Sequence, residues 1–582
     1  MSEVFDFIVV GGGQAGLTVA SRLSENPKLK VLVLEAGGTG IGNDGIRIPG
    51  MIVTTLGSDI DWKYSTVPQE GANHREIYYP RGKVLGGSSA INFIISTKAE
   101  VEDYEAIKRL APPITDSDYI YNTENHGTDG PVTNSFPKYI PPQFGLTLLL
   151  LPRLVNEDPF GGKLGGACII PSAIDTKGAR VTSATAYYFP HQSRPNLIVR
   201  VDCEVNKLIL QETQINGEIQ VLGVEYSSGG TVCRVMADEV IMSAGSIGTP
   251  AILERSGIGK ASILKSLNIP IALQPGGCRF ESIGSLFVLS TYRLKPGHRT
   301  ADDLAKDVEY AAEQKLIYDK SGSGMFSHAL SVLDFQSLKS ILGRRVEASG
   351  GMSKLYVTQA IRGRRQSDQE RGGVEYFCLT LSWNPMAPGQ RHALHGRGDF
   401  TAVPIIARLV SHQEPRSQCG AFNRSTYAPF ISPKIRVYLQ ALFVDNQLRT
   451  SLRISVHPFD AWLMVQGAKH IRKIMRQDAY KDIIIDEQYP GPSVQTDEEW
   501  GESIRSRIST SYHPSGTCSM LPQSESGVVD SQLKVYGTRN LRVVDASILP
   551  IQLSGHPVMT VYAIAEKAAE MILNKEPSNL PS

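Results

Sequence analysis

Residues 5–16 read FDFIVVGGGQAG, an apolar run that leads directly into closely spaced glycines. The run at 5–10 is nearly all apolar, which is typical of a parallel strand buried on both faces. Gly11, Gly13 and Gly16 follow with the spacing G-x-G-x-x-G. In a strand–turn–helix unit, glycines at this spacing make a tight turn, let the backbone approach a pyrophosphate and allow the helix to pack closely on the strand.

The residues that follow agree with this interpretation. Residues 14–24 are mostly small and predict a helix, and residues 30–35 predict a second apolar strand. This strand ends in Glu35, and an acid at this point can accept a hydrogen bond from a ribose hydroxyl. The alternative is a glycine-rich turn without a ligand. Because strand, helix, second strand and acid occur in register, we expect a dinucleotide site, which the motif alone assigns to neither NAD nor FAD.

The composition is that of a globular protein. Hydrophobic residues make up 41 % of the chain and charged residues 20 %, which argues against a disordered or fibrous protein. A length of 582 residues corresponds to about four domains of average size, but large α/β enzymes use fewer and bigger domains, so we expect two intertwined domains. With 59 basic and 58 acidic residues the net charge is +1, and we therefore expect no nucleic-acid partner.

Cysteine usage and the N-terminal sequence bear on the compartment. The seven cysteines are scattered and never spaced C-x-x-C, so they predict neither a disulfide framework nor a zinc site, and no metal is expected. The first residues lack the basic start and apolar core of a secretory signal, and no apolar run approaches the ~20 residues that span a bilayer. We therefore expect a cytoplasmic protein without a membrane span.

Other segments carry recognisable patterns. Residues 80–92 are a second glycine-dense segment, and residues 238–243 predict a strand that leads into the sequence AGSIGTP at 244–250 and then a helix of about one to two turns. Residues 460–475 and 560–572 have apolar residues at helical spacing, which predicts packing helices.

Together these segments resemble the glucose–methanol–choline (GMC) family of FAD-dependent oxidoreductases, in particular the fungal aryl-alcohol oxidases and dehydrogenases. The resemblance rests on residues 82–99 and 245–259, and on YHPSGTC at 512–518, LRVVDAS at 541–547 and GHP at 555–557. It implies an α/β fold, with a Rossmann-like FAD-binding domain and a discontinuous substrate-binding domain on an antiparallel sheet. The implied boundaries are 1–100, 190–290 and 505–582 for the FAD-binding domain, and 101–189 and 291–504 for the substrate-binding domain.

The resemblance also implies contacts to each part of FAD. The residues implied are Gly11, Gly13 and Gly16 for the pyrophosphate; Glu35 for the adenosine ribose; Gly86, Gly87, Ser88 and Asn92 along the flavin side; the backbone of Val205 for the adenine; Asp545 and Ala546 for the ribityl–phosphate portion; and Pro557 and Val558 beside the isoalloxazine. For Asp545 the alternative role is to cap a turn or a helix.

His513 and His556 resemble the catalytic pair of the family. Many members have Asn at the second position, whereas two histidines also occur in aryl-alcohol oxidases. Oxidation of an alcohol removes a proton from oxygen while a hydride leaves carbon for the flavin, and a neutral histidine can accept that proton near neutral pH. The resemblance implies that His513 is the principal base and that His556 orients the same hydroxyl through a hydrogen bond.

Some parts of the chain depart from the family pattern. Ser96 stands where an aromatic residue or Ala is usual, residues 104–126 lack a Gly-Trp element, and residues 275–280 replace the usual Pro-Gly-x-Gly followed by Asn and Asp-His. Residues 390–453 are rich in Arg and His and have weak periodicity. They are either an insertion in the substrate-binding domain or a gene-model error such as a retained intron.

Three hypotheses for function follow. The first is oxidation of a small primary or secondary alcohol, of aromatic or polyketide type and belonging to secondary metabolism, with FAD as acceptor. The second is a lyase or dehydratase-cyclase on the same scaffold, in which the histidine pair performs acid–base elimination without net oxidation. The third, motivated by the departures above, is a flavin-binding protein without catalysis. A serine hydrolase is disfavoured, because the nearest G-x-S-x-G candidate begins with Ala244.

Overall fold

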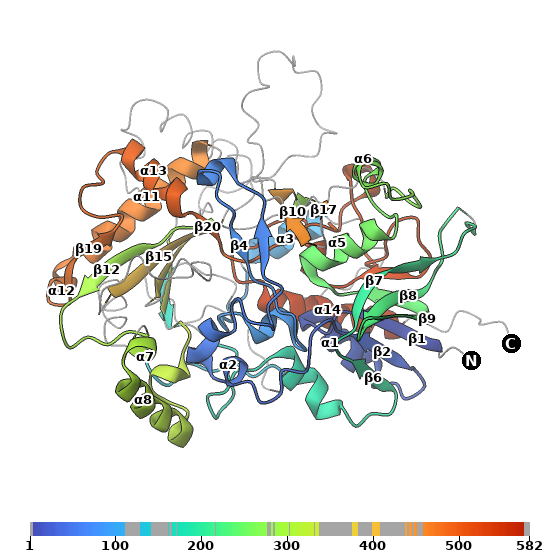
Figure 1. Ribbon diagram of the computed structural model, residues 1–582, viewed down its shortest axis with the longest axis horizontal. Helices are drawn as coiled ribbons and strands as arrows, with labels where there is room; N and C mark the ends of the chain where they lie inside the picture. The colour runs from blue at the N-terminus through green and yellow to red at the C-terminus, as the bar shows by residue number, and fades with distance from the viewer. Residues whose placement is uncertain are drawn as a thin grey trace, which may run out of the picture.

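The computed structural model describes the chain in segments. They are residues 4–99, 101–110, 129–140, 161, 166–169, 171–215, 217–275, 281–282, 286–301, 303–330, 332–336, 375–381, 399–407, 437–438, 442–444, 447–450 and 458–574. Two large sheets organise these segments, one toward each end of the long axis of the molecule (Figure 1). The described part of the chain is therefore an α/β structure, as predicted.

The first sheet is built around the predicted strand. β1 (Val4–Val10) lies between β2 (Val31–Leu34) and β9 (Thr231–Met242), and pairs in parallel with both. β6 (Leu197–Arg200) extends the sheet beyond β2, and β21 (Leu541–Val543) pairs in parallel with β9. Because parallel strands point the same way, the carboxyl ends of β1, β2, β9 and β21 meet at one edge, where ligands bind in open α/β sheets.

An antiparallel extension completes this sheet. β8 (Val221–Ser228) pairs with β9, and β7 (Glu204–Leu210) pairs with β8. All seven strands of the sheet fall within the ranges predicted for the FAD-binding domain.

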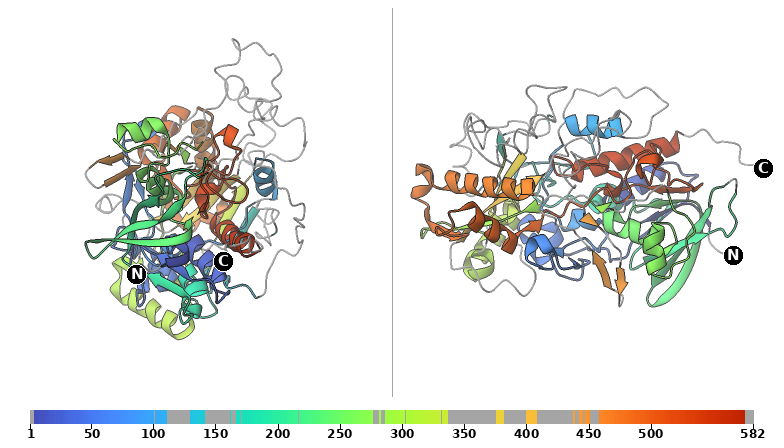
Figure 2. Two further views of the ribbon diagram at one scale, coloured as in Figure 1. Left: turned by 90° about the vertical axis from the view of Figure 1, so that its right-hand side faces the viewer. Right: turned by 90° about the horizontal axis from the view of Figure 1, so that it is seen from above.

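Two helices from opposite ends of the sequence pack side by side on this sheet. α1 (Gln14–Leu23) follows the glycine turn, and α14 (Val558–Leu573) follows the GHP segment. A Cβ on Gly16 would lie only 2.0 Å from the Gly11 carbonyl oxygen, so only glycine lets α1 approach the strand this closely. Figure 2 shows α14 at the same end of the molecule as the blue N-terminal strands, with the orange α11 at the other end.

α5 (Gly245–Arg255) is longer than the predicted one to two turns, because it begins before Pro250 rather than after it. A proline in a helix has no N–H for the carbonyl four residues earlier, which here belongs to Ser246. The Thr517 hydroxyl donates to that carbonyl at 2.9 Å, so a tertiary contact supplies the missing hydrogen bond. The helix therefore continues through the proline.

The second sheet is antiparallel, as predicted for the substrate-binding side. Its strands, in spatial order, are β19 (Ile484–Tyr489), β12 (Ser290–Leu294), β15 (Asp399–Ala407), β14 (Glu375–Leu381), β13 (Val332–Gln336) and β5 (Gly166–Ile169). Two short strands, β11 (Leu286–Phe287) and β20 (Ser509–Thr510), pair with each other, and β11 also pairs with β15. β15 comes from the unusual segment 390–453, so this part of that segment belongs to the sheet. The departures at 111–126 and 276–280 lie outside the described residues.

Smaller elements surround the two sheets. A third sheet joins β3 (Tyr64–Thr66), β4 (Tyr78–Tyr79), β17 (Leu442–Val444) and β18 (Gln447–Thr450), and β10 (Glu281–Ser282) pairs with β16 (Val437–Tyr438). The other α-helices of the described segments are α2 (Asp44–Arg47), α3 (Val101–Leu110), α6 (Ala261–Ser266), α7 (Asp303–Lys306), α8 (Val308–Ser321), α11 (Pro458–Met475), α12 (Asp478–Lys481) and α13 (Asp497–Arg507). α11 and α13 pack together at the end of the molecule that holds the antiparallel sheet (Figure 1).

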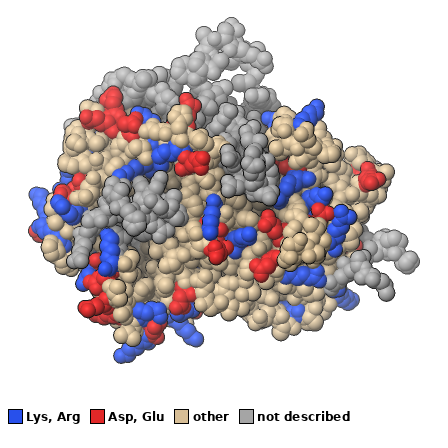
Figure 3. All heavy atoms as spheres, viewed as in Figure 1, with Lys and Arg blue, Asp and Glu red and all other residues tan. Residues whose placement is uncertain are grey.

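The charged residues on the face shown in Figure 3 are mixed, with Lys and Arg beside Asp and Glu. This mixture agrees with the net charge of +1. Among the described residues, no helix is both long and apolar enough to cross a bilayer.

Candidate active site

A cavity of about 790 Å³ opens at the carboxyl edge of the parallel sheet and extends toward the antiparallel sheet. Most residues that the sequence singled out line it. These are Gly11, Gly13, Glu35, Gly87, Ser88, Asn92, Val205, His513, Asp545, Ala546, His556, Pro557 and Val558. Gly16 and Gly86 do not line the cavity, since Gly16 faces the strand and the positive φ of Gly86 (98°) instead serves a turn.

Two glycine-rich segments form a cradle in one part of this cavity. A Cβ on Gly13 would meet only the Gly87 Cα, at 3.8 Å, so the space beside Gly13 opens into the cavity. Gly87 has a φ of +52°, and a Cβ there would lie 2.7 Å from the Gly13 Cα. The N-terminus of α1 also lines the cavity, through Gln14 and Ala15. Bare backbone at a helix N-terminus is the arrangement that receives a pyrophosphate, so these residues fit the dinucleotide FAD.

Glu35 lies at the end of β2 and is buried. Its Oε2 accepts a hydrogen bond from the Gly12 N–H at 2.8 Å, and its Oε1 accepts one from the Gly37 N–H at 2.9 Å. Burial raises the pKa of Glu35 to about 7, although the two backbone donors lower it. A carboxylate has about four acceptor positions, so both oxygens keep capacity for a ribose hydroxyl.

Asp545 follows β21, and its carboxylate is occupied by donors of the protein itself. Oδ1 accepts from the Ser547 N–H at 2.8 Å, and Oδ2 accepts from the Gly245 N–H at 2.9 Å and from the Thr249 hydroxyl at 2.6 Å. These contacts are those of a cap, which was the alternative role for this residue. The cap ties the start of α5 to the segment after β21, and Asp545 lines the cavity from there.

His513 and His556 face each other in the same cavity. Their ring centroids are 5.2 Å apart and their planes meet at 81°. Burial lowers the pKa of His556 to about 3. Burial also holds the pKa of His513 well below 6.5, and the neighbouring His556 and Arg81 lower it further. Both imidazoles are therefore neutral at pH 7, which is the state that can accept a proton.

The backbone around His513 is held by the antiparallel sheet on one side and by α5 on the other. The pairing of β20 with β11 brings the segment to the antiparallel sheet, and Tyr512 adopts a φ of 65° directly before the histidine. The Tyr512 ring makes edge contacts with Tyr79 and Phe287, at centroid distances of 6.0 and 6.1 Å. On the other side the Ser246 hydroxyl donates to the Pro514 carbonyl at 2.7 Å. These contacts fix the position from which the His513 ring reaches the cavity.

The backbone around His556 is held by residues 97–103, which follow the glycine-dense segment 80–92. The His556 N–H donates to the Thr97 hydroxyl at 3.1 Å, and the same hydroxyl lies 3.3 Å from His556 Nδ1. The Ser554 N–H donates to the Asp103 carboxylate at 2.8 Å. A Cβ on Gly555 would lie 2.7 Å from the Lys98 carbonyl oxygen, so the two backbones are in contact.

Thr97 and Arg81 were not predicted as site residues. The signal for Thr97 is a polar pair, Ser96 and Thr97, directly after the apolar run at 93–95. Ser96 departs from the family pattern, but the contact with His556 belongs to its neighbour Thr97. Arg81 lines the cavity from the start of the glycine-dense segment 80–92, and a lone arginine in such a segment carries no specific signal.

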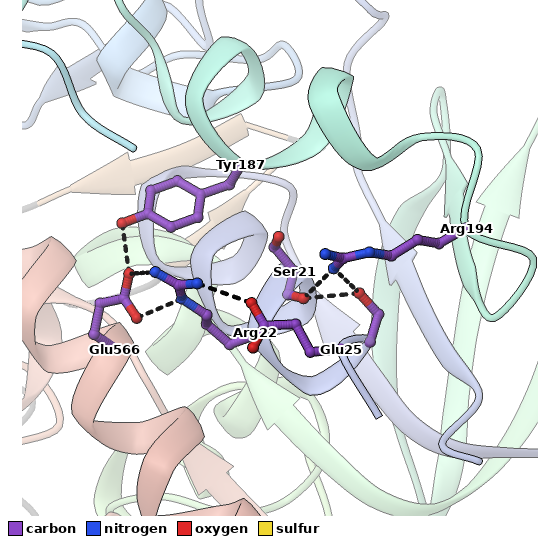
Figure 4. Close-up of polar contacts among 7 residues, drawn as sticks. Ser21, Arg22, Glu25, Tyr187, Arg194 and Glu566 are labelled. Atoms are coloured by element: carbon purple, nitrogen blue, oxygen red, sulfur yellow. Dashed lines mark hydrogen bonds and ion pairs between the residues drawn. The ribbon is translucent and has the colours of Figure 1, made fainter. Parts of the chain in front are cut away.

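A polar cluster joins the two helices that border the cofactor cradle (Figure 4). The Glu566 carboxylate of α14 accepts from the Arg22 guanidinium of α1 at 2.7 and 3.0 Å, and from the Tyr187 hydroxyl at 2.7 Å. At the other end of the same helices, the Gln14 side-chain amide donates to the Val558 carbonyl at 2.6 Å. The helices are therefore connected at both ends, and their N-termini are held beside the cavity.

A dinucleotide cradle that opens onto two neutral, facing imidazoles is an arrangement that suits a cofactor-dependent oxidoreductase. Comparison with known proteins agrees with this class. The family model described as GMC oxidoreductase matches residues 5–110 and 148–286 with its N-terminal part and residues 435–565 with its C-terminal part. The chain belongs to the GMC oxidoreductase family, whose members use FAD.

Individual relatives align over nearly the whole chain. The GMC oxidoreductase family protein Mala s 12 of Malassezia sympodialis is 32 % identical over 98 % of this chain and 92 % of its own length. The mitochondrial choline dehydrogenase of Mus musculus is 29 % identical over 98 % of this chain and 89 % of its own length. The solved structure of an FAD-dependent oxidoreductase from Chaetomium thermophilum superposes with a TM-score of 0.78 at 26 % identity, and covers 98 % of this chain and 99 % of that one. The predicted fold and cofactor are thus confirmed.

Proposed function

We propose that the protein oxidises a neutral, largely apolar alcohol, of aromatic or polyketide type, with His513 as the base. The observation that carries this proposal is the pair of neutral, facing imidazoles in the cavity that also contains the glycine cradle. A neutral imidazole can take the hydroxyl proton of an alcohol near pH 7. One relative of the chain is a choline dehydrogenase, and choline is an alcohol.

Apolar side chains support the substrate class. Phe93, Ile95, Phe287 and Leu330 line the cavity together with the histidines. They belong to, or pack against, one hydrophobic cluster beside the antiparallel sheet. An apolar wall of this kind stabilises an aromatic or aliphatic substrate by burying its surface, and it offers no partner to a highly hydroxylated sugar.

A positive charge near the base argues against a cationic alcohol such as choline. The Arg81 guanidinium lines the cavity and is one of the groups that lower the pKa of His513. A quaternary ammonium group bound beside His513 would be repelled by this guanidinium. The preferred alcohol is therefore neutral.

Each residue near the substrate has its own role in the proposed reaction. His513 accepts the proton of the substrate hydroxyl, while His556 orients the substrate oxygen through a hydrogen bond. Gly13, Gly87 and Glu35 would hold FAD, which when bound would supply the acceptor for the hydride of the alcohol carbon. The apolar wall lies beside the histidines and limits the water that can reach the reacting groups.

The test is an absorbance spectrum of the purified protein, followed by anaerobic mixing with a panel of alcohols. We expect flavin bands that bleach with benzylic or other apolar alcohols and do not bleach with choline at equal concentration. Product without bleaching would instead support the lyase, and bleaching by choline alone would refute the substrate class. A colourless protein that cannot be reconstituted with FAD would refute the cofactor site.

A further inference from the structure

We propose that Thr97 is a positioning residue that keeps the proton of His556 on Nε2, so that His556 donates a hydrogen bond to the substrate oxygen and His513 alone acts as the base. This inference rests on the proposed alcohol oxidation for its kinetic consequence. The proton position itself is a property of the two side chains and can be measured without a substrate.

The hydroxyl of Thr97 has a defined set of partners. Its Oγ1 accepts a hydrogen bond from the His556 backbone N–H at 3.1 Å, and a backbone N–H can only donate. The second contact of Oγ1 is His556 Nδ1, at 3.3 Å. Thr97 is fully buried, and within the described part of the chain its hydroxyl has no other acceptor for its own proton. The Thr97 O–H therefore donates to Nδ1.

This hydrogen bond determines the tautomer of the histidine. A neutral imidazole carries one proton, and a ring nitrogen that accepts a hydrogen bond cannot carry it. With Nδ1 as the acceptor, the proton of His556 is on Nε2. The opposite tautomer would turn both Thr97 contacts into accepted hydrogen bonds and leave the buried hydroxyl proton without a partner.

Backbone contacts hold Thr97 and His556 beside each other. Thr97 and His556 lie on backbones that touch each other, since Gly555 packs on the Lys98 carbonyl. The Asp103 carboxylate holds the Ser554 N–H two residues before the histidine. Thr97 does not line the cavity, so it acts on the substrate through His556.

A fixed tautomer divides the roles of the two histidines. An Nε2–H group on His556 can donate to the substrate oxygen and stabilise the negative charge that develops there, but it cannot take a proton. The contact of His513 is compatible with a proton on its Nδ1, because the Ser511 hydroxyl, 3.4 Å from this nitrogen, can accept as well as donate, and its Nε2 is then an acceptor. The proton acceptor is therefore His513.

The first test reads the proton position directly. The FAD-bound protein would be labelled with ¹⁵N-histidine, and the His556 signals assigned by their loss in His556→Asn. We expect a protonated Nε2 and an unprotonated Nδ1 in the wild type and in Thr97→Ser, and a shift toward a mixture of tautomers in Thr97→Val, which keeps the shape but lacks the hydroxyl. A wild-type His556 that is protonated on Nδ1, or a Thr97→Val spectrum identical to the wild type, would overturn the proposal.

The second test measures flavin reduction after rapid anaerobic mixing with an alcohol. Removal of a residue that orients a histidine at a metal site typically costs about 10–100-fold, and we expect a loss of similar order in Thr97→Val and recovery of most of the rate in Thr97→Ser. Asparagine has no tautomers, so in the His556→Asn background the fold-loss of rate caused by Thr97→Val should be less than about a third of the fold-loss that it causes in the wild type. An equal loss in both backgrounds would show a purely structural role. If no alcohol reduces the flavin, the proposed oxidation fails, while the tautomer measurement still decides the role of Thr97.

Discussion

Gly13→Ala should abolish FAD binding without unfolding the protein. The added Cβ would meet only the Gly87 Cα, at 3.8 Å, which is an ordinary van der Waals contact. The φ of Gly13 is −87°, a value that alanine adopts without strain. The methyl group therefore points into the cavity, where the resemblance to the GMC family places the pyrophosphate. Because Gly13 is the N-cap of α1, its replacement by alanine should cost below about 1 kcal/mol in the absence of FAD.

The loss of FAD binding can be measured through the unfolding temperature. A ligand at 100 times its dissociation constant stabilises the folded state by about 2.7 kcal/mol, so FAD should raise the unfolding temperature of the wild type clearly. The variant should unfold near the temperature of the FAD-free wild type, with and without FAD. Unfolding would be followed by tryptophan fluorescence, and retained flavin by absorbance after gel filtration.

Two other glycines serve as controls for this experiment. A Cβ on Gly38 would lie 3.9 Å from its nearest neighbour, the Asp202 Oδ1, and Gly38 does not line the cavity, so Gly38→Ala should keep both stability and FAD. A Cβ on Gly16 would lie 2.0 Å from the Gly11 carbonyl oxygen, so Gly16→Ala should destabilise the protein with or without FAD. If Gly13→Ala binds FAD with wild-type affinity, or unfolds as Gly16→Ala does, the steric reasoning is wrong.

Three further predictions concern ionisable side chains. His513→Ala should retain FAD but reduce its flavin about 10²–10⁴-fold more slowly in rapid mixing, and a wild-type rate would exclude this base. Because the pKa of His513 is held well below 6.5 by burial, the rate of flavin reduction should stay constant as the pH falls through 6.5, and a decline centred at 6.5 or above would contradict the lowered pKa. Glu254 in α5 is buried, its carboxylate accepts no hydrogen bond from the described residues, and burial raises its pKa to about 8. Because the folded-state pKa lies above the unfolded value, the wild type loses stability as the pH rises from 4.5 to 8, by at most about 1.4 kcal/mol per pH unit. The unfolding temperature of Glu254→Leu should therefore rise relative to that of the wild type over this range. Parallel curves of unfolding temperature against pH would refute this.

The parts of the fold that the sequence predicts are those whose chemistry is local. The turn at Gly11 to Gly16 needs glycine for steric reasons, so its spacing reveals the strand, the helix and the cradle together. The helix α5 shows the opposite case. Pro250 suggests a helix start, and only the distant Thr517, which satisfies the Ser246 carbonyl, lets the helix extend through it.

The candidate site was predictable to a similar extent. Family-like motifs identified His513 and His556, and the structure places both in one cavity. The contact between Thr97 and His556 joins residues 459 positions apart, and no local pattern predicts such a pair. The predicted domain boundaries remain predictions, and β11 and β20 pair with the antiparallel sheet although they lie within the ranges expected for the FAD-binding domain.

The pairing of α1 with α14 has a consequence for how the protein is made. The Arg22 and Glu566 side chains that join these helices are 544 positions apart, and β21 also reaches the first sheet from the end of the sequence. Chains with such long-range contacts fold slowly, because a long loop must close before the contact stabilises anything. On the ribosome, the parallel sheet therefore lacks β21 and the cradle lacks its neighbour α14 until residues 541–573 have been synthesised. Throughout that interval, apolar strands such as β1 are exposed in the nascent chain and can aggregate. The yield of folded protein in cells should therefore depend on chaperones and on translation rate more strongly than the stability of the folded protein suggests.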